Sequence, residues 1–153
     1  MQLTTRSTWA KAAAIGLATA AASILGPVQT AAAGESCTLG MCSETVNQSS
    51  TWVVAYKNWT CSTGSTGTSS TGCVQTNDNT KIRTLAPWTQ TPGGEDWDAF
   101  RVDAGYCFKV RFTTVYGSSS TKYYNRSGLG AVYVKVGNDA TAYVLAQKYG
   151  ACP

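Results

Sequence analysis

Hydrophobic and polar side chains alternate without interruption from Tyr106 to Thr113. One set is apolar and consists of Tyr106, Phe108, Val110 and Phe112; the other consists of Cys107, Lys109, Arg111 and Thr113. A period of two residues is typical of a half-buried β-strand. The aromatic residues of the apolar set predict that this strand carries the largest share of the core. The opposite set is expected to meet water and a disulfide partner.

Shorter segments of alternating or β-branched composition predict further strands at residues 51–57, 80–86, 99–103, 121–125, 131–136 and 141–149. In the first of these, Trp52 falls on the side expected to face the core. Gly, Ser, Asn and Pro separate the segments, and no stretch after residue 33 has a sustained helical period. The pattern predicts an all-β fold, a disulfide-stapled antiparallel β-sandwich or small barrel of about seven strands, with residues 51–153 as a single domain.

Two segments lack a hydrophobic pattern. Residues 62–71 contain only Ser, Thr and Gly, and this low-complexity composition predicts a mobile loop. Residues 34–50 are polar and irregular, and we interpret them as an extended, exposed N-terminal arm. An ordinary edge strand is the alternative for this second segment.

Residues 1–33 have the organisation of a secretory signal peptide. Arg6 and Lys11 precede an uncharged, alanine-rich stretch at 12–25, and small residues at 31–33 provide a cleavage site. Residues 26–27 are Gly-Pro and interrupt the apolar run, which falls short of the roughly 20 residues that a membrane span needs. We therefore expect a secreted, extracellular protein without membrane attachment after cleavage.

The sequence contains six cysteines: Cys37, Cys42, Cys61, Cys73, Cys107 and Cys152. An even number in an exported chain indicates disulfides. A zinc site is disfavoured because there is no histidine and no pair of C-x-x-C motifs. Among the roughly 15 possible connectivities, we favour the local one, which pairs Cys37 with Cys42, Cys61 with Cys73, and Cys107 with Cys152.

The charge of the chain gives little indication of a nucleic-acid partner. The formal net charge is +4, and loss of Arg6 and Lys11 with the signal peptide lowers it by two. Lys109 and Arg111, with Arg101, Lys135 and Lys148 on neighbouring strands, would form one positive face. Such a face is either simply solvated or recruits an acidic protein surface.

The sequence lacks the residues of a nucleophilic triad, and a paired-carboxylate hydrolase is the one catalytic alternative that its composition leaves open. Without histidine a Ser-His-Asp or Cys-His arrangement is impossible, and oxidised cysteines supply no thiolate nucleophile. The acidic residues Glu95, Asp96 and Asp98 follow Gly93-Gly94, so a solvated loop with local ion pairs is expected, with a calcium site as the alternative. We expect no cofactor, no metal and no enzymatic activity.

Candidate partner-binding residues fall into two groups. Trp59, Trp88 and Trp97 are predicted in loops or at strand ends beside polar residues, where tryptophan suits sugar stacking or a protein hot spot. The competing interpretation folds them over the end of the sandwich. The apolar residues of the arm form the second group and are Leu39, Met41 and Val46.

The alanine-rich leader, the Ser/Thr/Gly loops and the cysteine-bonded β pattern together resemble small secreted proteins of actinobacteria. These include enzyme inhibitors, lectins and the small adaptor subunit of umbrella toxin particles. The adaptor resemblance implies a β-sandwich that joins a large repeat-bearing toxin chain to a lectin subunit through an extended N-terminal arm. That arm would be residues 34–50, with its anchor sequence at 42–46.

The leading hypothesis is accordingly a non-enzymatic protein-binding adaptor in an extracellular assembly. Its partner would be a larger co-secreted chain, with carbohydrate contacted only indirectly. The alternatives are an inhibitor of a secreted hydrolase, which would present a disulfide-framed loop, and a carbohydrate-binding module.

Overall fold

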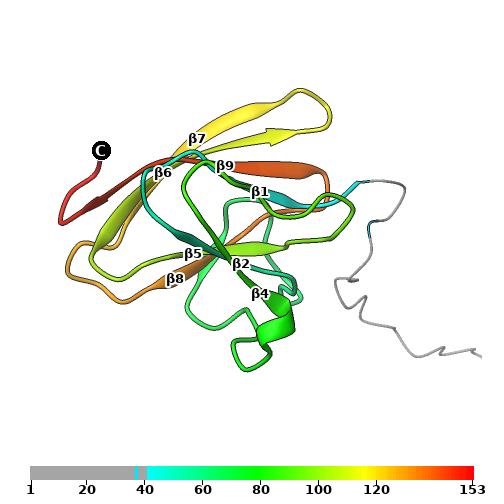
Figure 1. The fold of residues 1–153 in the computed structure, drawn as a ribbon, viewed down its shortest axis with the longest axis horizontal. Coiled ribbons are helices and arrows are strands. Elements are labelled where there is room, and N and C mark those ends of the chain that lie inside the picture. Colours follow the sequence, from blue (N-terminus) through cyan, green and yellow to red (C-terminus); the bar gives the residue numbers. More distant parts are fainter. Residues whose placement is uncertain (1–36, 38–40) are drawn as a thin grey trace, which may run out of the picture.

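The computed structural model describes residue 37 and residues 41–153. The expected signal peptide at 1–33, and Leu39 of the expected arm, lie outside the described residues. The described chain is all-β, with two sheets packed face to face and not closed into a barrel (Figure 1). A single 3-10 turn, η1 (Asn79–Lys81), is the only helical element in this part of the chain. No helix there is long and apolar enough to cross a membrane.

The first sheet has the strand order β1 (Glu44–Asn47), β9 (Ala140–Tyr149), β6 (Tyr106–Thr114) and β7 (Ser119–Asn125). The second has the order β3 (Ser69–Ser70), β8 (Val132–Lys135), β5 (Ala99–Val102), β2 (Val53–Tyr56) and β4 (Ile82–Leu85). The described residues thus form nine strands, the expected seven and in addition β1 and β3. Every pair is antiparallel except β1 with β9, which is parallel.

The core lies between the sheets and is centred on β6, as the alternation predicts. Phe108, Val110 and Phe112 are buried, and Phe112 packs with Phe100 of β5 across the sandwich at a ring-centroid distance of 6.4 Å. Aromatic pairs at such distances add to the stabilisation from apolar burial. Cys107 differs from expectation, because it belongs to the outward set yet is fully buried. Its sulfur is bonded to Cys152, in the segment that follows β9.

The N-terminal segment corrects the expectation of an exposed arm. Residues 44–47 form β1 beside β9, and alternate side chains from Ser43 to Ser49 are buried. The outer edge of β1 is covered in turn, because Asn47 N donates to Thr89 O at 2.8 Å and Thr91 N donates to Thr45 O at 3.0 Å. The described residues 41–50 are therefore part of the domain, and the alternative of an edge strand is the correct one.

The loop between Cys61 and Cys73 also differs from expectation, because it is docked on the body of the protein. Its centre forms β3, which pairs with β8. Gly67 N donates to Lys135 O at 2.8 Å, Tyr124 Oη donates to Gly67 O at 2.9 Å, and Gly137 N donates to Thr66 Oγ1 at 3.0 Å. The interpretation as a mobile loop is wrong, since polar groups of two other strands satisfy its backbone.

Three disulfides join the cysteines in the local pattern expected from the sequence. The pairs are Cys37–Cys42, Cys61–Cys73 and Cys107–Cys152, and no cysteine is free. Structural disulfides of this density are typical of extracellular proteins.

Candidate functional site

The structure exposes the tryptophan that was expected in the core and buries two of the three that were expected in loops or at strand ends. Trp59 and Trp97 are buried, with 5% and 3% of their surface exposed. Trp59 packs in a small cluster behind the Cys61–Cys73 disulfide, and its Nε1 donates to Thr63 O at 2.9 Å. Trp52, which the alternation assigned to the core, is 60% exposed. Trp88 is 74% exposed and is the one member of the predicted set that faces solvent.

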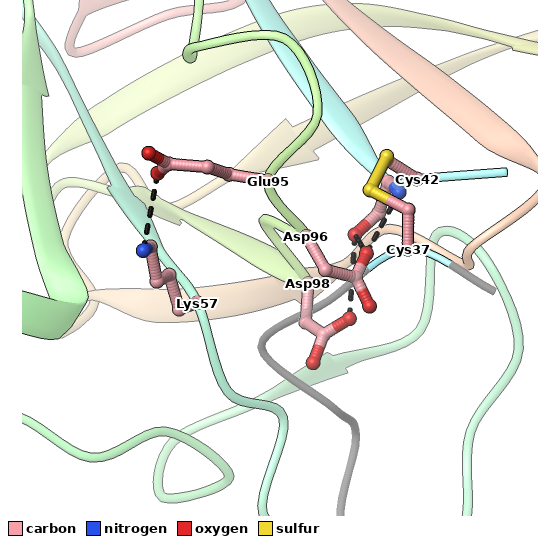
Figure 2. Close-up of a disulfide and its surroundings, with 7 residues drawn as sticks. Cys37, Cys42, Lys57, Glu95, Asp96 and Asp98 are labelled. Atoms are coloured by element: carbon pink, nitrogen blue, oxygen red, sulfur yellow. Dashed lines mark hydrogen bonds and ion pairs between the residues drawn. A yellow bond between two sulfur atoms is a disulfide. The ribbon is translucent and has the colours of Figure 1, made fainter. Parts of the chain in front are cut away.

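The acidic residues divide into one surface group and two buried ones. Glu95 forms an ion pair with Lys57 at 3.1 Å, as a loop carboxylate is expected to do. Asp96 and Asp98 are buried, which corrects the expectation of a solvated cluster. Figure 2 shows the two side chains below the Cys37–Cys42 disulfide, with Glu95 directed to Lys57 on the other side. Within the described residues, no group of His, Cys, Asp and Glu side chains is arranged to hold a metal ion.

Asp96 and Asp98 fasten the start of β1 to the second sheet. Asp96 Oδ1 accepts hydrogen bonds from Ser43 N at 2.8 Å and from Ser43 Oγ. Asp98 Oδ1 also lies 3.3 Å from Ser43 Oγ, and its Oδ2 accepts from Trp59 N at 3.1 Å. Burial raises the pKa of Asp98 to about 6, against the hydrogen bond from Trp59 N, and the neighbouring Asp96 raises it further. Three of the four carboxylate oxygens accept from the protein's own backbone and hydroxyl groups, which gives both residues a structural role, while Asp96 Oδ2 is buried without a hydrogen-bond partner.

The predicted basic stripe is divided between the two sheets, so the expectation of a single positive face is wrong. Arg101 lies on β5 and pairs with Asp103 at 2.6 Å. Lys135 lies on β8, where its Nζ donates to Gly64 O at 2.9 Å. Only Lys109, Arg111 and Lys148 belong to the first sheet.

On the outer side of the first sheet, the two central cations are interleaved with tyrosines. Lys109 Nζ lies 5.8 Å from the ring centroid of Tyr123 on β7, and the Arg111 guanidinium lies 4.9 Å from that of Tyr143 on β9. The register places each pair directly across from one another. Cation–π contacts hold these long side chains in place, so less conformational entropy is lost when a partner binds.

The same surface extends over all four strands. Val46 of β1 is paired with Tyr143, and Thr121 of β7 is paired with Arg111. We call this surface the open face and define it by Val46, Lys109, Arg111, Thr121, Tyr123 and Tyr143. Val46 was expected to bind a partner as part of a free arm; it is half-buried within the sheet, as Met41 is half-buried just before it. The two tyrosines were missed, because only the strand register brings them beside the cations.

Strand β7 is an edge of the first sheet, and one side of its backbone is free. Arg126 N donates to Tyr106 O at 2.7 Å, and Thr114 N donates to Ser118 O at 2.9 Å. Hydrogen-bonded positions alternate along an antiparallel ladder, so every second residue of β7 between these two pairs directs its N–H and C=O groups at β6. It follows that the outward N–H and C=O groups are those of Ser119, Thr121, Tyr123 and Asn125. No strand in the described part of the chain pairs with this edge.

The described fold and this surface define a class of protein, a disulfide-bonded β-sandwich in which the outer side of one sheet is open to solvent and adjoins the unpaired edge of β7. Comparisons of the chain with protein-family models, curated proteins and solved structures found no match.

Proposed function

We propose that this is a secreted, non-enzymatic protein-binding adaptor that receives its partner on the open face and the free edge of β7. The observation that carries the proposal is the coincidence of an unpaired strand edge with an adjoining row of ordered tyrosines and cations. An edge strand supplies main-chain hydrogen bonds to an added strand, and neighbouring side chains supply specificity. The partner is a larger co-secreted chain that contributes one extended segment.

The chemistry of the open face indicates what that segment carries. Side chains of an added strand alternate between two faces, so half of them lie beside Tyr123 and Lys109. Acidic residues at these positions would be attracted to Lys109 and Arg111, and aromatic or apolar ones would pack on the tyrosine rings. Lys122 projects from β7 toward the opposite face and is exposed. Such an inward-directed charge on an edge strand discourages pairing between two copies of the same edge.

The absence of the usual catalytic groups supports a binding function. The sequence has no histidine, and its cysteines are joined in disulfides. The paired carboxylates of Asp96 and Asp98 are buried and hydrogen-bonded to Ser43 and Trp59 N. An adaptor of an extracellular toxin assembly is the particular form of this proposal that the sequence resemblance favours. In this proposal the partner contacts the open face, to which Val46 contributes from within β1, and not a free arm, since residues 41–50 form part of the domain.

The proposal is tested by pull-down from culture supernatant with tagged wild-type protein and two variants of one residue. Thr121→Pro removes an outward N–H from β7 and leaves the hydrogen bonds to β6 in place, so the edge stays folded but is blocked. Thr121→Val keeps the N–H and is the matched control. We expect Thr121→Pro to lose the partner and Thr121→Val to retain it, with both variants unfolding at similar temperatures.

Three outcomes distinguish the alternatives. Capture of a large co-secreted chain by wild type and Thr121→Val alone supports the adaptor. Capture of a single hydrolase whose activity falls on binding identifies an inhibitor. If Thr121→Pro captures the same proteins as wild type, the β7 edge is not the interface.

A further inference from the structure

Two exposed tryptophans, Trp52 and Trp88, lie at one end of the sandwich. The buried side chain of Asn47 bonds to both of the segments that carry them. Asn47 Nδ2 donates to Thr51 O at 2.7 Å, next to Trp52, and to Ala86 O at 3.0 Å, two residues before Trp88. The β2–β4 ladder ends at the Val53–Leu85 pair. Trp52 immediately precedes Val53 and Trp88 comes three residues after Leu85, so both belong to segments at the same end of two adjacent strands. We call Trp52 and Trp88 the tryptophan pair.

Trp88 occupies a backbone conformation that disfavours its own side chain. Its φ is 65°, and it is the only non-glycine residue with positive φ in the described part of the chain. Thr89 N donates to Ala86 O at 3.2 Å and closes a turn with Pro87 and Trp88 at its centre. Proline followed by a residue with positive φ is the pattern of a type II turn, where the second position normally holds glycine. A bulky residue at such a site carries a backbone cost, which is a reason to look for a function of its side chain.

The segments around the tryptophan pair are polar but uncharged. Residues 48–53 and 85–91 contain hydroxyl and amide side chains and no Asp, Glu, Lys or Arg. The loop before Trp52 is held by Gln147, whose Nε2 donates to Ser49 Oγ at 2.6 Å. Exposed aromatic rings among neutral hydrogen-bonding groups match the two surfaces of a sugar ring, its apolar C–H face and its hydroxyl rim. An acidic or basic ligand would find no complementary charge in these segments.

We propose that the tryptophan pair binds a neutral polysaccharide, with Trp52 and Trp88 stacking on sugar rings of one chain. This site is separate from the free edge of β7, because β1 and β7 are opposite edges of the first sheet and the tryptophan pair lies at the β1 side, where residues 89–91 cover β1. The protein therefore has two binding surfaces, one for a protein strand and one for a glycan. Contact with carbohydrate is direct in this proposal.

The test is affinity electrophoresis of the full chain, with its disulfides formed, in gels containing soluble β-glucan, xylan or galactomannan. Polygalacturonate serves as an acidic polysaccharide, and sedimentation with cellulose and chitin extends the panel to insoluble glycans. We expect binding to at least one neutral polysaccharide and no retardation by polygalacturonate. Trp52→Ala and Trp88→Ala should each abolish that binding. Tyr116→Ala is the matched control, because Tyr116 is 78% exposed in the β6–β7 turn, and it should bind as wild type does.

A further variant separates ligand binding from a structural role of Trp88. Trp88→Gly relieves the positive φ, so the melting temperature should rise while glycan binding is lost. Failure of every neutral polysaccharide to bind overturns the proposal, as does unchanged binding by both alanine variants. Loss of a captured protein in Trp88→Ala, without binding of any glycan by wild type, would assign the tryptophan pair to a protein partner and also overturns it.

Discussion

At the residue scale, several polar side chains that the sequence suggested would be solvated are buried in the structure. Asp98 and Asn47 are buried, and each joins backbone segments that are distant in the sequence. Polar groups that are buried in this way stabilise a fold only while their hydrogen bonds are complete. The consequences of changing them can therefore be predicted from their partners.

The first prediction concerns pH. The folded-state pKa of Asp98, about 6, lies above its ordinary value of 3.8, so folding favours the protonated form. Its contribution to stability is fully present below the ordinary pKa and is lost as pH rises through 6. One pKa unit corresponds to roughly 1.4 kcal/mol, so the loss is at most about 3 kcal/mol. Denaturant unfolding between pH 4 and 7.5 should show this loss in wild type and a flatter profile in Asp98→Asn. An identical slope in both proteins would contradict the assignment.

The second prediction concerns Asn47. Its side chain donates to Thr51 O, Leu85 O and Ala86 O and accepts from Ser49 N, so Asn47→Ala leaves several buried backbone groups without a partner. We expect a loss of about 1–3 kcal/mol in the free energy of unfolding. Gln48→Ala is the neighbouring control and should change stability by less than about 0.5 kcal/mol. Equal effects in the two variants would show that Asn47 does not hold these segments together.

At the element scale, strand β1 and the loop that contains β3 both belong to the folded body. Strand β1 extends the first sheet beyond β9, and β3 extends the second beyond β8. Neither is apolar; each is held mainly by backbone hydrogen bonds to a neighbouring strand and by a nearby disulfide. A truncation starting at Thr51 would remove β1, its buried side chains and the cover of β9. We therefore expect that truncation to be poorly folded.

The third prediction tests whether the loop is docked. Gly67 and Gly117 have similar positive φ values, 84° and 82°. A Cβ at Gly67 would lie 2.6 Å from Lys122 Nζ and 3.0 Å from Tyr124 Oη, whereas one at Gly117 would have no atom within 4 Å. Both alanine variants carry a backbone cost of roughly 1–2 kcal/mol, but only in Gly67→Ala must the Lys122 ammonium and the Tyr124 hydroxyl, which donates to Gly67 O, also move. Thermal unfolding should show the larger loss for Gly67→Ala; equal losses would mean that the loop does not pack on β7.

At the scale of the whole molecule, two sheets, three disulfides and a central strand form a body with distinct outer surfaces. The open face covers the outer side of the first sheet and ends at the free β7 edge, whereas the tryptophan pair lies toward the opposite edge, at β1. The disulfides contribute by restricting the unfolded chain, and the contribution grows with the length of the closed loop.

The fourth prediction ranks the cross-links. Cys107–Cys152 spans 45 residues and joins the buried centre of β6 to the C-terminal segment, whereas Cys61–Cys73 spans 12. Replacing each pair with alanines should cost about 2–5 kcal/mol, and the loss of Cys107–Cys152 should be the larger by about 1 kcal/mol on loop entropy. Denaturant midpoints measure the order. Alkylation of the native protein followed by mass spectrometry should label no cysteine, and any labelled thiol would contradict the complete pairing.

The sequence by itself determined the all-β class and the central strand, and it favoured the disulfide pairing that the structure has. These follow from local information, because a period of two residues is read within one segment and the favoured cysteine pairs are neighbours along the chain. The residues of the core strand, Phe108, Val110 and Phe112, were identified for this reason. The cations of the open face were found in the same way, but not the tyrosines that order them.

The tertiary structure alone decided which polar segments are buried and which tryptophans are exposed. Residues 41–50 and 62–71 resemble solvated loops in composition, yet their backbone groups bond to partners such as Thr91, Asp96 and Lys135, tens of residues away. Trp52 and Trp88 are exposed at the end of the β2–β4 pair, whereas Trp59 N donates to Asp98 and Trp97 N donates to Ser43 O in the buried part of the protein. The composition of a segment shows how many polar groups would lose water on burial. The hydrogen-bond partners that compensate for this loss come from distant strands, so they are known only from the tertiary structure.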